Sequence, residues 1–125
     1  MTRFPVNVAT VRIAFACAIG LASSGAALAH AELHHASPEA GSAVSEPPHE
    51  VTLTFTDTLE AAFSSADVTD SSGARVDEGK SRVNGNMIRI GLKMLSPGSY
   101  RVHWRAVSVD THRSEGSFTF SVSGR

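Results

Sequence analysis

A strict alternation of apolar and polar residues does most to limit what this chain can fold into. In segments 51–55 and 100–106, every second residue is apolar. Successive side chains of a β-strand point to opposite faces, so a period of two predicts strands with one buried face and one wetter face. Similar alternation or weaker strand signals occur at 33–37, 66–69, 74–76, 88–92 and 118–122.

Turn residues separate these segments at short intervals. Asn84-Gly85 lies between two of them and predicts a hairpin, because asparagine and glycine adopt the positive φ that tight turns need. No segment after His30 has the spacing of an amphipathic helix. About seven short strands predict an all-β fold. We expect a small antiparallel Greek-key barrel or sandwich, immunoglobulin-like in outline.

The first 29 residues have a different composition from the rest of the chain. Two arginines near the start precede an apolar or small-residue stretch at 13–28, and Ala-Leu-Ala follows at 27–29. This order is typical of a secretory signal peptide, and the stretch is shorter than the roughly 20 residues that span a membrane. We expect cleavage before His30, a periplasmic domain of residues 30–125, and no membrane span after processing.

Removal of residues 1–29 would also take away Cys17, the only cysteine. The processed domain would then have neither a disulfide nor a thiolate. Segment 30–125 carries nine Lys and Arg and twelve Asp and Glu, a formal charge of −3 with neutral histidines. A mildly acidic domain without a basic stripe is a poor candidate for binding nucleic acid or anionic lipid.

Three residues are candidate metal ligands. An N-terminal His30, created by cleavage, would offer its α-amine and its imidazole Nδ1, which can close a chelate ring on one metal. Asp110 and His112 are two residues apart at the end of a predicted strand. On extended backbone they would face the same side, about 6.5–7 Å apart, within reach of one cation. The alternative is that Asp110 caps a turn and His112 is solvated.

The sequence around these residues resembles a known family. Residues 104–112, Trp-Arg-Ala-Val-Ser-Val-Asp-Thr-His, and 116–120, Gly-Ser-Phe-Thr-Phe, are similar to the signature of the periplasmic copper-binding CopC family. The start at 30–33 and the run from Ser37-Pro38 to 53–55 are similar as well. The resemblance covers essentially all of the processed chain, and it implies a small Greek-key β-barrel related to cupredoxins.

The resemblance also implies one Cu(II) per chain, bound by His30, Asp110 and His112. Their nitrogen and oxygen donors suit the tetragonal coordination that Cu(II) prefers, and the loss of Cys17 excludes a blue-copper electron-transfer centre. Some members of the family carry a second, Cu(I) site in a methionine-rich loop. Only Met87 and Met94 remain after processing, so no dedicated Cu(I) site is expected.

Three functions follow from these residues. The expected one is a periplasmic Cu(II) carrier or buffer in copper homeostasis or resistance, not an enzyme. Its partners would be the copper ion and, as a candidate, an inner-membrane copper transport protein. One alternative is a histidine-brace copper enzyme, but the chain leaves little room for an aromatic substrate platform. The other alternative is a metal-free immunoglobulin-like interaction module, in which the three residues are incidental.

Overall fold

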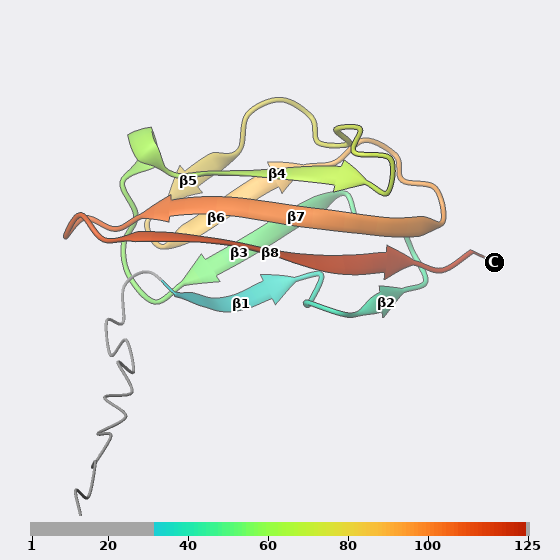
Figure 1. Cartoon of the computed structure of the whole chain (residues 1–125), viewed down its shortest axis with the longest axis horizontal. Helices are drawn as coiled ribbons and strands as arrows, with labels where there is room; N and C mark the ends of the chain where they lie inside the picture. The colour runs from blue at the N-terminus through green and yellow to red at the C-terminus, as the bar shows by residue number, and fades with distance from the viewer. Residues whose placement is uncertain (1–31, 125) are drawn as a thin grey trace, which may run out of the picture.

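Two four-stranded sheets pack face to face in the computed structural model, which describes residues 32–124 (Figure 1). One sheet has the order β1-β3-β6-β5, and the other has the order β2-β8-β7-β4. All pairs are antiparallel except β2 with β8. The strands are β1 (Leu33–Ser37), β2 (Ala43–Val44), β3 (Glu50–Phe55), β4 (Ser65–Asp70), β5 (Arg82–Asn84), β6 (Met87–Gly91), β7 (Gly98–Val107) and β8 (Arg113–Val122).

The all-β prediction is confirmed, and the chain passes from sheet to sheet between β1 and β5, as in a Greek-key sandwich. The predicted strand at 74–76 is wrong. Val76 N–H donates to Val68 C=O at 2.9 Å, whereas Val76 C=O accepts from Lys93 N–H at 2.8 Å. This segment therefore bonds to β4 on one side and to the residues after β6 on the other, and neither side gives a continuous ladder.

The predicted hairpin is present as β5 and β6, and its turn lies within the predicted connection between residues 83 and 87. Asn84 pairs with Met87, so the two central residues are Gly85 and Asn86. Gly85 has a φ of 63°, and Asn86 is not among the residues with positive φ. Glycine at the first central position fits a type II′ turn, whereas Asn-Gly at the centre would have favoured type I′.

The inward-facing residues of both sheets form one core. Leu53 and Phe55 on β3, Ile88 on β6 and Val102 on β7 are all at most 1% exposed, as the alternation predicted. Trp104 and Phe118 are partly buried and pack against this core. Burial of such apolar side chains is the main favourable contribution to folding. Phe63 differs: it lies in a 3₁₀ turn (η1, Ala61–Phe63) outside the sheets and is 66% exposed.

The start of β1 and the turn between β7 and β8 lie at the same end of the sandwich (Figure 1). The segment that follows β3 connects them. Thr56 N–H donates to Glu32 C=O at 2.9 Å, and Glu32 N–H donates to Thr56 Oγ1 at 3.1 Å. Two residues later, Thr58 C=O accepts from Val109 N–H at 3.0 Å. We call this end of the molecule the hairpin end.

Within residues 32–124, no helix is both long and apolar enough to cross a bilayer.

Candidate metal centre

The turn between β7 and β8 carries two of the three predicted ligands. Ser108 N–H donates to His112 C=O, and Thr111 N–H donates to Ser108 C=O, both at 2.9 Å. Thr111 has a φ of 73°, the single positive φ among the non-glycine residues of 32–124. A turn closed by a residue of this conformation is the usual form of a three-residue hairpin loop. The loop consists of residues 109–111.

This geometry corrects how Asp110 and His112 were expected to meet. β7 ends at Val107 and β8 begins at Arg113, so both residues lie in the connection between the two strands and not in a strand. The turn itself brings the side chains together: His112 Nδ1 is 3.1 Å from Asp110 Oδ1. The side chain of His112 is 45% exposed and that of Asp110 is 54% exposed, so a metal ion from solution can reach both.

Asp110 also caps the turn, as the alternative interpretation expected. Its Oδ1 accepts a hydrogen bond from the hydroxyl of Ser108 and a long one, 3.5 Å, from the N–H of His112. The Ser108 hydroxyl, followed by the contact with His112, lowers the pKa of Asp110 to about 2. Capping therefore does not remove the negative charge of Asp110, because hydrogen bonds to the ionised carboxylate favour its charged form.

Ser108 is a site residue that the sequence reasoning missed. It lies two residues before Asp110, and its side chain is fully buried. The signal was present in the Ser-x-Asp-x-His spacing, but a hydroxyl in this position was interpreted only as part of the family signature. Strand alternation gave no reason to expect a hydrogen bond between Ser108 and Asp110. Residues two positions apart on an extended strand are about 6.5–7 Å from each other.

The third predicted ligand, His30, lies outside the described residues. Within 32–124, no group of three His, Cys, Asp or Glu side chains is placed to hold a metal ion. Glu32 is fixed at the hairpin end by its bonds to Thr56.

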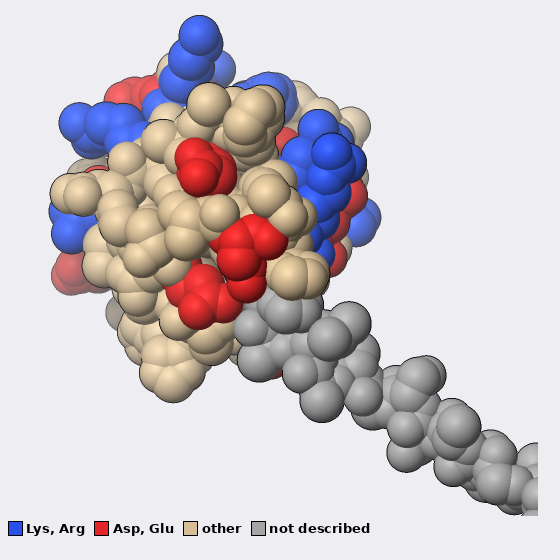
Figure 2. Space-filling model, turned by 90° about the vertical axis from the view of Figure 1, so that its left-hand side faces the viewer, with Lys and Arg blue, Asp and Glu red and all other residues tan. Residues whose placement is uncertain are grey.

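Acidic residues gather at the hairpin end. In Figure 2, which looks onto this end, Asp and Glu lie near the middle of the face, and Lys and Arg lie mainly toward its rim. The acidic residues on the segments that meet here are Glu32, Asp57, Glu60 and Asp110. A cluster of one sign raises the local concentration of the opposite charge, so this face attracts cations.

None of the other histidines of segment 32–124 belongs to the β7–β8 turn. His34 and His35 on β1 are both exposed. His103 is on the outer face of its sheet, the wetter side that alternation predicted. Its two ring nitrogens face Asp67 Oδ2 at 3.4 Å and Glu115 Oε1 at 2.9 Å. Because these carboxylates lie against different nitrogens, they do not converge on one coordination point.

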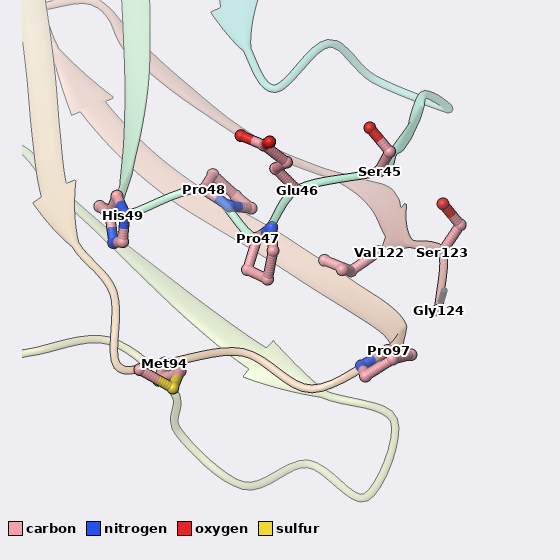
Figure 3. A pocket seen from close by; sticks show the side chains of 10 residues that line it. All are labelled: Ser45, Glu46, Pro47, Pro48, His49, Met94, Pro97, Val122, Ser123 and Gly124. Carbon is pink, nitrogen blue, oxygen red and sulfur yellow. The ribbon is translucent and has the colours of Figure 1, made fainter.

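The two methionines lie at opposite ends of β3. Met87 pairs with Thr54, near the hairpin end. Met94 follows Leu92, whose N–H donates to the C=O of His49 at the start of β3. Met94 is 93% exposed and lines an open, mainly apolar cavity together with His49 and three prolines, Pro47, Pro48 and Pro97 (Figure 3). The thioethers are thus not placed to share one metal ion.

Comparison with known proteins places these features in a family. Residues 33–123 match the CopC domain. The chain is 36% identical over 98 residues to protein YobA of Escherichia coli strain K12, a match that covers 75% of this chain and 79% of that protein. It is 37% identical over 108 residues to copper resistance protein C of Escherichia coli, with 77% and 83% covered.

A solved structure gives the same assignment. The crystal structure of CopC from Methylosinus trichosporium OB3b superposes with a TM-score of 0.71 at 32% sequence identity, covering 77% of this chain and 96% of that one. The match to the family thus extends over both sheets and the β7–β8 turn, and the sandwich is that of a solved relative. This chain belongs to the CopC domain family.

Proposed function

We propose that this protein binds one Cu(II) ion and acts as a periplasmic copper carrier or buffer in copper homeostasis or resistance. The observation that carries the proposal is the exposed pair at the β7–β8 turn, an ionised Asp110 whose Oδ1 is 3.1 Å from His112 Nδ1. The choice of copper is supported by the relatives, which are named copper resistance protein C and CopC.

The spacing of the pair suits one metal ion. Bonds of about 2.0–2.1 Å from a metal to oxygen and nitrogen place two neighbouring ligands of a square-planar ion about 2.9 Å apart. The distance of 3.1 Å between Asp110 Oδ1 and His112 Nδ1 is close to this value. The α-amine and imidazole of His30 would complete three nitrogens and one oxygen. This donor set binds Cu(II) more tightly than it binds Zn(II) or Ni(II).

Secretion is part of the proposal. Residues 1–29 have the composition of a signal peptide, and the match to the CopC domain begins only at residue 33. The signal peptide would direct export, and its cleavage before His30 would create the α-amine that serves as a ligand. The exposure of Asp110 and His112 would let a receiving protein exchange ligands directly, which suits delivery to an inner-membrane copper transporter.

A binding role is favoured over catalysis. In a histidine-brace enzyme, oxygen needs an open equatorial position, which Asp110 would fill in the proposed site. Copper-loaded protein incubated with a reductant, oxygen and polysaccharide should therefore release no oxidised sugars above a free-copper control. Release that disappears in His112→Ala would show that the protein is an enzyme.

The test of the proposal is a Cu(II) titration of protein beginning at His30, followed by electron paramagnetic resonance. We expect saturation at one equivalent with nitrogen hyperfine structure. Asp110→Ala and His112→Ala should each weaken binding at least about tenfold, as loss of metal-site groups commonly does. His34→Ala and His35→Ala are matched controls on β1 and should change little. If the protein does not bind copper at micromolar concentration, the proposal is wrong, and the metal-free interaction module is the remaining function.

A further inference from the structure

We infer that Ser108 is a positioning residue of the copper site, one that fixes Asp110 through its hydroxyl and His112 through its backbone. The inference rests on the proposed Cu(II) function but assigns a role to a residue that is itself no ligand. It predicts that Ser108 determines copper affinity through Asp110.

The burial of Ser108 is the first observation. Its side chain is 0% exposed, whereas Asp110, which it contacts, is 54% exposed. A buried hydroxyl without a partner destabilises the fold, so it needs a hydrogen bond. Ser108 Oγ finds that partner in Asp110 Oδ1. The hydroxyl thus connects the rigid interior to a carboxylate at the surface.

The backbone of Ser108 is held from two directions. Its N–H and C=O bond to His112 and Thr111 at 2.9 Å each and close the turn. On its other side it forms an isolated bridge with Leu59, next to the bond from Val109 N–H to Thr58 C=O. Ser108 is therefore a fixed point from which both ligands are placed.

Three contacts made by Ser108 and His112 converge on one oxygen of Asp110. The Ser108 hydroxyl, the His112 N–H at 3.5 Å and the His112 Nδ1 at 3.1 Å all meet Oδ1. Hydrogen bonds to an ionised acceptor are stronger than neutral ones, and together they fix the carboxylate plane relative to the imidazole. Without the hydroxyl, an exposed carboxylate is freer to rotate, and copper binding would have to restrict that rotation.

The conformation of Thr111 supports this account. A β-branched residue at a φ of 73° is unfavourable and persists only where its surroundings impose it. Here the imposing contacts are the two backbone bonds made by Ser108. The turn holds a strained residue in the one place that brings Asp110 and His112 together, which is expected if their relative placement is functional.

Ser64 provides a matched control for Ser108→Ala. Ser64 is 7% exposed, and its hydroxyl accepts from Val107 N–H at 3.0 Å and donates to Val107 C=O at 3.3 Å. Both variants lose a buried hydroxyl near the end of β7: Ser64 bonds to Val107, the last residue of the strand, and Ser108 is the next residue along the chain. We expect Ser108→Ala to weaken Cu(II) binding about 10–100-fold in competition with a chelator and to change the electron paramagnetic resonance spectrum. Ser64→Ala should remain within about twofold of the unmodified protein.

Two further comparisons isolate the hydroxyl. Threonine and valine have nearly the same shape, so Ser108→Thr should bind Cu(II) about tenfold or more tightly than Ser108→Val, even where the added methyl lowers stability. In an Asp110→Ala background, Ser108→Ala should cause no further loss, because a residue that acts through Asp110 has nothing left to position.

The inference and the proposed function fail in different ways. Equal affinities of the Thr and Val variants, or the same loss from Ser108→Ala with and without Asp110, would overturn the role of Ser108 while copper binding stands. If the unmodified protein beginning at His30 does not bind Cu(II), the proposed function is wrong, and with it the inference.

Discussion

His112 Nδ1 and Asp110 Oδ1 lie 3.1 Å apart across the β7–β8 turn. Two of the proposed ligands are thus at a spacing that one metal ion could bridge. Binding then needs little rearrangement of the turn, and less of the interaction energy is spent on ordering the ligands.

Copper affinity should fall as the pH falls from 8 to 5, and Asp110 should not be the cause. The Ser108 hydroxyl and His112 lower the pKa of Asp110 to about 2, so this carboxylate takes up its proton only far below that range. An α-amine ordinarily titrates near 7.7–8.0 and an imidazole near 6.5, and protons compete with copper for both. Asp110→Ala should therefore lower the affinity at every pH without changing the shape of the curve. A decline that begins only below pH 5 would contradict this.

The protein should be folded without copper. Both sheets and their core are complete within residues 32–124, with Val51, Leu53, Val68, Ile88 and Val102 at 0% exposure. Copper then adds stability by mass action alone, about 2.7 kcal/mol at a free concentration one hundred times the Kd. Circular dichroism of chelator-treated protein should show β structure. A random-coil spectrum that becomes β on adding copper would contradict this prediction.

Gly116→Ala should destabilise the hairpin that carries the site. A Cβ at this position would lie 2.7 Å from Cη2 of Trp104, on the strand paired with it. Overpacking of this kind costs about 1–3 kcal/mol of unfolding free energy. Gly91→Ala is the control, since the nearest heavy atoms to a Cβ there are 3.9 Å away. Thermal unfolding measures both. If the Gly116→Ala and Gly91→Ala variants had equal melting temperatures, the Trp104 side chain would have to move aside at no cost in stability.

Cu(II) should be retained in preference to Cu(I). The proposed ligands are nitrogen and oxygen, and the thioethers of Met87 and Met94, which select Cu(I), lie at opposite ends of β3. Reduction of the bound ion with ascorbate should speed its loss to a Cu(I) chelator. The double variant Met87→Leu, Met94→Leu should retain Cu(II) and Cu(I) as the unmodified protein does. If this variant abolished tight Cu(I) binding, a thioether site would be proven.

Alternation predicted the strands well, because one face of each sheet is buried. Val51, Leu53 and Phe55 all face the core, and β1 has the predicted bounds of Leu33–Ser37. Segments too short to show an alternating pattern were not predictable in this way. The two-residue strand β2 and the bridges around Arg75 and Asp77 depend on tertiary contacts, which a local pattern does not encode.

The proximity of Asp110 and His112 was expected from the sequence, but its geometry was not. Asp110 and His112 were expected to meet through strand alternation, yet they meet through a turn. The turn depends on a positive φ at Thr111, a conformation that threonine rarely adopts and that the sequence therefore does not suggest. The part played by Ser108 follows from that turn, since only its geometry brings the hydroxyl to Asp110.

The central claim is that cleavage before His30 creates the copper site. In the precursor that nitrogen is a peptide amide and cannot act as an amine ligand. The deciding measurement compares the Cu(II) affinity of protein beginning at His30 with that of protein carrying one extra glycine before it, both shown to be folded by circular dichroism. Loss of a nitrogen and its chelate ring should weaken binding more than the roughly 10–100-fold expected of a supporting residue. If the extended protein binds Cu(II) as tightly as the one beginning at His30, the assignment of the His30 α-amine as a ligand is wrong. The site must then be built from Asp110, His112 and other residues.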